Sequence, residues 1–220
     1  MVSSNLRTWF DRFTKAIKRF GYSLCQSDHT LFVKHSTKGR IVIITVYVDD
    51  IILTGDHVEK IGKLKSFLSH EFKIKDLGNL KYFLMMEIVR SKMGIVVSQH
   101  KYILDLLKET RMLGCKPTNT PMDYTTKLGM VKGSAPVDKG RYQRLVEKLV
   151  YLSHTRLDIT FSVSIISQFM NNPVKEHMKM VYHILRYLKI TPRKGVYFKR
   201  TQKRNIEIFS NANWVSSIID

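Results

Sequence analysis

The chain has 220 residues, 44% of them hydrophobic and 25% charged, which fits a globular protein with a sizeable core in one or two domains. No apolar run is long enough to span a bilayer, so we expect no membrane-spanning helix. Lys and Arg number 37 against 18 Asp and Glu, and the formal net charge of +19 favours a polyanion over a charge that serves solubility alone.

The first half of the chain predicts helices and strands in mixed order. Trp9, Phe13 and Ile17 are spaced as in an amphipathic helix, and Gly21 ends that pattern. Runs of β-branched and aliphatic residues predict strands on either side of the turn "HSTKG". Helices are expected at residues 7–20 and 58–72, and strands at 30–34, 41–48 and 51–54.

The second half predicts a hairpin followed by helices. "LGNLKYFLMMEIVRS", "KMG" and "IVVSQ" predict two strands and their turn. Residues 116–138 are rich in Pro, Thr and Gly and are interpreted as a linker. Helices are expected at 102–109, 140–152, 158–170 and 174–188, before a final hairpin made of "GVYFKR" and "NIEIFSN". The fold class expected from this order is α+β.

Asp49 and Asp50 interrupt the most strand-like stretch, "IITVYVDDIILTGD". Two adjacent carboxylates there face partial burial and mutual repulsion, so we expect a positive group to compensate them. We expect both at the tip of a hairpin, where their side chains converge into an oxygen-rich site suited to Mg²⁺. The alternative is that Asp is simply a common turn residue.

The two cysteines and the motifs that the sequence lacks argue against several classes of protein. Cys25 and Cys115 form no disulfide framework and no signal peptide precedes them, so we expect an intracellular protein that is not secreted. Cys25 with His29 lacks the second Cys/His pair of a zinc site. The sequence also contains no H-E-x-x-H, no G-x-S-x-G and no Walker-type glycine loop.

Tyr47, Val48, Asp49 and Asp50 have the form Y-x-D-D, which resembles the catalytic signature of reverse transcriptases. The series continues with "FKIKDLGNLKYFL", "MEI", "GIVVSQHKYILDLLKE", "GCKPTNTPMD" and "YQRLVEKLVYLSHTRLDI". In this order the chain resembles the Ty1/copia-type retrotransposon polyprotein, from the palm of its reverse transcriptase to the start of its RNase H.

The resemblance implies roles for individual residues. Asp49 and Asp50 would hold the two Mg²⁺ ions of nucleotidyl transfer, with Mn²⁺ as a possible substitute, and Tyr47 and Val48 would support the motif. Met93, Gly94 and Ile95 would belong to the primer-grip hairpin, and the helix at 102–109 would open the thumb. Lys73 or Lys75 would lie near the incoming nucleotide, unless both are merely solvated.

The resemblance also implies segments and partners. The expected segments are 1–90, part of a reverse transcriptase palm; 91–135, primer grip, thumb start and linker; 136–195, a helical connection; and 196–220, the first hairpin of an RNase H-like domain. Expected partners are an RNA template with its DNA primer, deoxynucleoside triphosphates and the remainder of a polyprotein, with no membrane. The expected location is the cytoplasm or nucleus, or a virus-like particle for an intact element.

Some positions depart from the family pattern. The family's third metal-binding aspartate precedes the first helix, so we expect this chain to begin after it. Met85 replaces a glycine, Leu157 replaces a proline, and Asn211 replaces the first RNase H metal ligand. An amide binds Mg²⁺ more weakly than a carboxylate does. We therefore expect a reverse transcriptase fragment that is inactive alone, or alternatively a non-catalytic nucleic-acid-binding remnant or pseudogene product.

Overall fold

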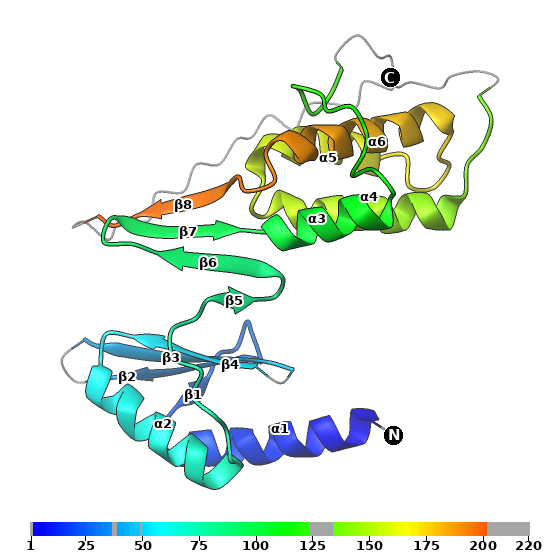
Figure 1. Ribbon diagram of the computed structural model, residues 1–220. Helices are drawn as coiled ribbons and strands as arrows, with labels where there is room; N and C mark the ends of the chain where they lie inside the picture. Colours follow the sequence, from blue (N-terminus) through cyan, green and yellow to red (C-terminus); the bar gives the residue numbers. More distant parts are fainter. Residues whose placement is uncertain (1, 37–38, 49, 124–133, 202–220) are drawn as a thin grey trace. The chain divides into compact units, whose positions relative to one another are not determined.

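The computed structural model describes residues 2–36, 39–48, 50–123 and 134–201 of the chain. It divides into two compact units, Met1–Leu80 (unit 1) and Lys81–Asp220 (unit 2) (Figure 1). Each unit mixes helices with an antiparallel sheet, so the α+β class is confirmed. None of the helices that the structure describes has the length and apolar character needed to cross a bilayer.

Unit 1 is a four-stranded antiparallel sheet with both of its helices on one face (Figure 1). Its elements are α1 (Val2–Arg19), β1 (Ser23–Leu24), β2 (Leu31–His35), β3 (Ile41–Tyr47), β4 (Asp50–Gly55) and α2 (Val58–Phe72), and the strand order is β1-β2-β3-β4. Alternate residues of β3, namely Val42, Ile44 and Val46, are buried in a core with Phe13 of α1 and Leu64 of α2. Every second residue of β3 therefore packs against helix residues spaced three to four apart, and together they form one apolar layer.

The predictions for unit 1 are close to the observed elements. The helix at 58–72 is confirmed without change, and the three strands are confirmed with ends shifted by one residue. The first helix begins earlier than predicted, at Val2, and ends at Arg19, where Gly21 follows with φ +84°. The two-residue strand β1 was not predicted, because two residues carry no measurable periodicity.

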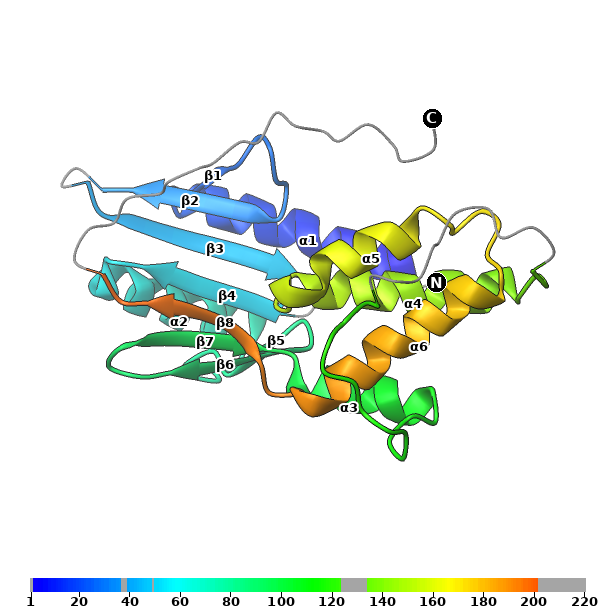
Figure 2. The ribbon, with the colours of Figure 1, turned by 90° about the horizontal axis from the view of Figure 1, so that it is seen from above.

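Unit 2 combines a second antiparallel sheet, of order β5-β6-β7-β8, with a group of helices. The elements are β5 (Tyr82–Phe83), β6 (Met86–Arg90), β7 (Gly94–Ser98), α3 (His100–Glu109), α4 (Lys139–Ser153), the 3₁₀-helix η1 (Leu157–Ile159), α5 (Thr160–Ser167), α6 (Lys175–Ile190) and β8 (Gly195–Lys199). The core packs α3, α4, α5 and α6 together, with Leu107, Leu149, Ile166 and Leu185 fully or almost fully buried. Within this unit, Figures 1 and 2 show the strands extending from one side of the helices.

Two predictions for unit 2 need correction. The helix at 158–170 is a 3₁₀-helix followed by a shorter α5, and the segment at 77–91 contains two strands rather than one. The final strand, β8, pairs with β7. Its predicted partner, "NIEIFSN", lies outside the described residues, so the assignment of 196–220 to an RNase H-like domain stays a prediction. The compact units meet at 80/81. The boundary at residue 90 was predicted for family segments rather than for compact units, and it stays a prediction.

The extra strand arises from a tight turn at Leu84–Met85. Phe83 pairs with Met86, so only these two residues connect β5 and β6, and their φ angles are +46° and +57°. Two positive φ values define a type I′ turn, which favours Asn-Gly. The glycine of the family pattern suits the place that Met85 occupies.

We expect Met85→Gly to raise the free energy of unfolding of the chain by about 0.5–1 kcal/mol. Glycine relieves the strain of the left-handed backbone at position 85. Two effects offset part of this gain: glycine has more conformational freedom in the unfolded chain, and the 3.0 Å hydrogen bond from Tyr82 Oη to Met85 Sδ is lost. Urea unfolding measures the change. The control Met86→Gly, inside β6, should lower stability instead, and a Met85→Gly chain no more stable than the parent would contradict the turn assignment.

Candidate functional site

The β3–β4 hairpin carries the paired aspartates. Tyr47 pairs with Asp50, so Val48 and Asp49 are the two residues that connect the strands. The prediction that Asp49 and Asp50 together form the tip is therefore wrong for Asp50, because strand pairing extends through it as the first residue of β4. Asp49 lies outside the described residues.

Val48 has a strained backbone. Its φ of +52° lies in the left-handed region, where β-branched residues are genuine outliers. Such a conformation costs on the order of 1–3 kcal/mol and persists only where the surroundings fix it. Here the β3–β4 ladder, from Val42–Gly55 to Tyr47–Asp50, holds both ends of the turn. Strain of this kind is concentrated at functional sites, which makes the hairpin end a candidate site.

Asp50 lies on the sheet face that the helices of unit 1 leave open. Val46 and its partner Ile51 pack toward α1 and α2, and side chains alternate along each strand, so Tyr47 and Asp50 belong to the opposite face. Figure 1 shows both helices on the other side of the sheet. Asp50 is exposed and therefore accessible to a ligand from solvent.

The expected positive partner of the aspartates is not found for Asp50. Among the described residues, no Lys, Arg or His forms an ion pair with it. The prediction assumed partial burial, whereas Asp50 is exposed and water solvates its charge. Within the described part of the chain, the carboxylate is thus open to a cation from solvent.

The donor chemistry at the hairpin suits Mg²⁺ as part of a site. Within the described ranges, no group of three or more His, Cys, Asp and Glu residues could hold a metal ion. Mg²⁺ is commonly bound by one or two carboxylates together with substrate phosphates and waters. An exposed Asp50 next to Asp49 in the sequence fits that pattern as two of the ligands, and not as a complete protein cage.

The other predicted residues of unit 1 lie at the end of α2. Lys73 is its C-cap, with a left-handed φ of +54°, and both Lys73 and Lys75 are exposed. α2 follows β4 and runs back along the sheet toward the end where β3 and β4 connect (Figure 1). Neither lysine makes a hydrogen bond or ion pair with Asp50, so the structure leaves their nucleotide-proximal role as a prediction.

The predicted primer-grip residues lie in unit 2. Met93, Gly94 and Ile95 occupy the end of the β6–β7 hairpin, where Met93 is 65% exposed and Gly94 starts β7. The degenerate RNase H position, Asn211, lies outside the described residues.

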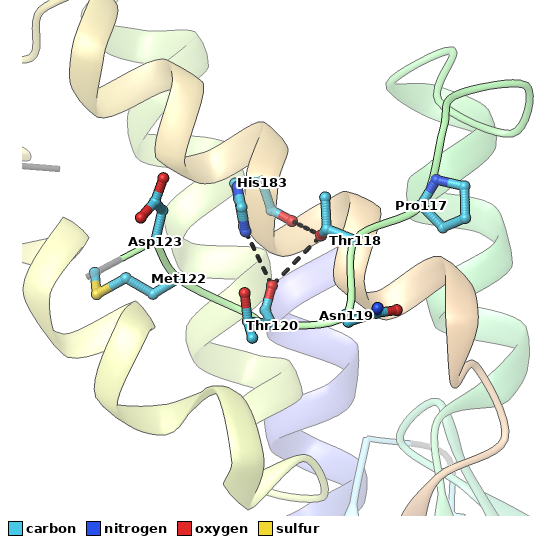
Figure 3. Close-up of a pocket in the computed structure, with 7 residues that line it drawn as sticks. All are labelled: Pro117, Thr118, Asn119, Thr120, Met122, Asp123 and His183. Atoms are coloured by element: carbon cyan, nitrogen blue, oxygen red, sulfur yellow. Dashed lines mark hydrogen bonds between the residues drawn. The ribbon is translucent and has the colours of Figure 1, made fainter. Parts of the chain in front are cut away.

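A pocket of about 490 Å³ in unit 2 contains none of the predicted site residues. Its lining residues are Pro117, Thr118, Asn119, Thr120, Met122, Asp123 and His183 (Figure 3). The Thr120 carbonyl is 3.0 Å from His183 Nε2, and Thr118 Oγ1 donates to the His183 carbonyl at 3.4 Å. Met122 is buried in the helical core. The stretch 116–123 thus packs on α6, so one apolar side chain and two polar contacts anchor the first part of the segment interpreted as a linker, residues 116–138.

The "TRLDI" motif forms a buried charge cluster. Arg156 is fully buried, with Nε and Nη2 donating to the Asp158 carboxylate at 3.0 and 2.9 Å and Nη1 donating to the Thr191 carbonyl at 2.9 Å. Tyr187 and Lys194 also donate to Asp158, at 2.6 and 3.2 Å. Burial alone would raise the pKa of Asp158, but hydrogen bonds from Arg156, Tyr187 and Lys194 outweigh it and hold that pKa well below its usual range. The motif therefore joins η1 to the end of α6.

Comparison with known proteins gives a consistent set of similarities. The profile of a family described as "Reverse transcriptase (RNA-dependent DNA polymerase)" matches residues 3–124. The chain is 38% identical, over 94% of its length, to the "Retrovirus-related Pol polyprotein from transposon RE1" of Arabidopsis thaliana. It is 35% identical, over 84% of its length, to the corresponding polyprotein from transposon TNT 1-94 of Nicotiana tabacum. No solved structure matches it.

The chain spans only 14% and 15% of the length of these two polyproteins. A shorter relative, an uncharacterized mitochondrial protein of Arabidopsis thaliana, is 34% identical over 78% of this chain and 71% of its own length. The similarity therefore extends beyond the matched profile into the helices of unit 2.

Proposed function

The chain belongs to the reverse transcriptase family, as a region of copia-type retrotransposon Pol polyproteins, and we propose that Asp49 and Asp50 bind Mg²⁺ for its nucleotidyl transfer. The observation that carries the proposal is the exposure of Asp50, without an ion-pair partner among the described residues, beside the strained Val48. Unit 1 is then part of the palm, and the β6–β7 hairpin and α3 are the primer grip and the start of the thumb. The helices α4, α5 and α6 form the connection.

Mg²⁺, or Mn²⁺ in its place, supplies activation of the primer 3′ hydroxyl and stabilisation of the leaving pyrophosphate when bound. The chain contributes carboxylate oxygens from Asp49 and Asp50, next to the sheet face that the helices of unit 1 leave uncovered. Lys73 and Lys75 are the cations proposed to approach the nucleotide phosphates. Because two adjacent carboxylates repel each other, metal binding by the pair alone is weak, and phosphate oxygens complete the site.

A third carboxylate is proposed to come from the remainder of the polyprotein. The two polyproteins are about seven times longer than the segment they share with this chain. We expect the 220 residues alone to give no primer extension on an RNA template. A polyprotein segment that includes the preceding family strand with its aspartate should extend the primer in Mg²⁺, and its failure to do so would contradict the proposal.

The charge distribution favours a nucleic-acid partner for unit 2. Unit 2 has 24 Lys and Arg against 10 Asp and Glu, a net +14, whereas unit 1 has 13 against 8, a net +5. The excess thus lies mainly outside the hairpin with the aspartates. This asymmetry also favours the second candidate function, non-catalytic nucleic-acid binding, in a chain that has lost its chemistry.

We expect affinity for an RNA–DNA primer–template duplex to fall steeply with salt. If the excess charge lines a cleft, the log–log slope should correspond to about five or more phosphate contacts. Titrations at several salt concentrations measure the slope, with heparin as the control polyanion. An affinity that does not change with salt, or equal affinity for heparin and duplex, would indicate that the charge is spread evenly over the surface. Such a result would contradict a nucleic-acid-binding cleft for both candidate functions.

A further inference from the structure

The turn between β6 and β7 is held by its own hydrogen bonds. Ser91 N donates to the Gly94 carbonyl at 2.8 Å, and Ser91 Oγ donates to the same carbonyl at 3.2 Å. Met93 N donates to Ser91 Oγ at 3.2 Å. These bonds close the turn, but none of them involves the Met93 carbonyl.

The partner of the Met93 carbonyl is strand β8. Tyr197 Oη, 104 positions along the chain, donates to the Met93 carbonyl at 2.8 Å, and the backbone N of Arg200 donates to it at 2.8 Å. The ladder pairs Gly94 with Lys199 and Val96 with Tyr197. Both lone pairs of one carbonyl at the turn are thus occupied by donors from the far end of unit 2.

The Tyr197 ring also covers Gly94. A Cβ at position 94 would lie 2.9 Å from Tyr197 Cε2 and 2.2 Å from the Phe198 carbonyl oxygen, closer than real Cβ contacts come. Glycine at this position therefore lets the ring and the β8 backbone approach the hairpin. The ring of Tyr197 thus lies against Gly94, and its hydroxyl donates a hydrogen bond to the preceding residue, Met93.

We propose that Tyr197 is a positioning residue for polymerisation: through the Met93 carbonyl and the face of Gly94, it fixes the end of the β6–β7 hairpin that holds the primer terminus. The inference rests on the proposed function, which assigns the primer end to Met93, Gly94 and Ile95. Strand β8 then belongs to the polymerase machinery, although it follows the helices in the sequence.

The size of the effect follows from the exposure of the bond. Tyr197 is 49% exposed, so water competes for the hydroxyl, and the Arg200 amide still serves the Met93 carbonyl when the hydroxyl is removed. Loss of one such hydrogen bond corresponds to roughly a 3- to 10-fold change in the population of the held state. Folding of unit 2 should survive, because the ring and its packing remain.

The test compares Tyr197→Phe with the parent in a polyprotein segment that is competent for primer extension. We expect hydrogen–deuterium exchange at Met93, Gly94 and the Arg200 amide to become faster. We expect kcat for extension to fall about 3- to 10-fold while the KM for the nucleotide changes little, as for the loss of positioning rather than of binding. The control Tyr82→Phe removes a hydroxyl from the same sheet away from the turn and should change neither quantity.

Two results would overturn the inference. Unchanged exchange at the turn in Tyr197→Phe would mean that the hydroxyl does not hold it. Faster exchange with unchanged extension would mean that the held turn is not used for the primer. The Asp49→Asn, Asp50→Asn variant separates this from the proposed function: if extension depends on the aspartates but not on Tyr197, only the positioning role fails.

Discussion

Primer extension by a polyprotein segment containing this chain should fall by more than about 100-fold when Asp49 and Asp50 are both replaced by asparagine. Replacing a residue that only hydrogen-bonds to a metal ligand already lowers metal affinity or activity by about 10–100-fold, so loss of the ligands themselves should cost more. An amide keeps the size and turn preference of the aspartate but removes the negative charge that attracts Mg²⁺. Each single substitution should remove most of the activity. Extension rates at several Mg²⁺ concentrations provide the measurement.

The matched control is Asp11→Asn, which removes an exposed carboxylate from α1 of the same unit. It should leave extension unchanged. Circular dichroism and thermal unfolding of the double variant should match the parent, because asparagine suits the hairpin as well as aspartate does. Undiminished extension in the Asp49→Asn, Asp50→Asn protein would mean that the two aspartates have only a structural role in the hairpin.

The sequence predicted the existence of the hairpin but not its register. An unbroken run of β-branched residues from Ile41 to Val46 identifies β3, and Gly55 ends β4. Which two residues form a turn depends on cross-strand pairing, and that is set by tertiary contacts rather than by local propensity. Asp50 therefore lies in a strand, and the left-handed residue is Val48, which no propensity would select.

Long-range contacts explain the other differences. The pairing of β8 with β7 joins residues about 100 positions apart, and no local pattern in "GVYFKR" specifies that partner. Tyr197 was missed for the same reason, because nothing near it in the sequence specifies a hydrogen bond to residue 93. The available local signal was its place beside Phe198 in a strand-like run. Residues 116–123 have the composition of a linker, but the buried side chain of Met122 and the contacts of Thr118 and Thr120 with His183 hold them on the helical core.

The buried Arg156 was also not identified from sequence. Arg is rarely fully buried unless it is paired, and the pairing here depends on Asp158 two residues later and on Thr191 at the end of α6. The motif resembles a family signature, yet its described contacts are all structural. A recurring motif in a family can thus mark a fold constraint as well as a catalytic site.

Asp158→Asn should lower the free energy of unfolding of the chain by about 3 kcal/mol, because breaking a buried ion pair leaves the other charge uncompensated. The Arg156 guanidinium, with no exposed surface, would keep only the Thr191 carbonyl and hydroxyl as full partners. Denaturant unfolding near neutral pH measures the loss. The control Lys194→Gln removes the half-exposed partner of the same carboxylate and should cost under about 1 kcal/mol, as a solvent-screened pair does.

The same substitution should change how stability responds to acid. The pKa of Asp158 is lowered in the folded chain, so its contribution is fully present above the unfolded value of about 4 and is lost as the pH falls below it toward the folded pKa. Other carboxylates titrate in that window too, and subtracting the Asp158→Asn curve from the parent curve isolates this one. The difference should be constant from about pH 7 to 5 and shrink steadily below about pH 4. A difference independent of pH down to 3 would mean that Asp158 stabilises unit 2 by shape and hydrogen bonding, and that its charge contributes nothing to holding Arg156 in the core.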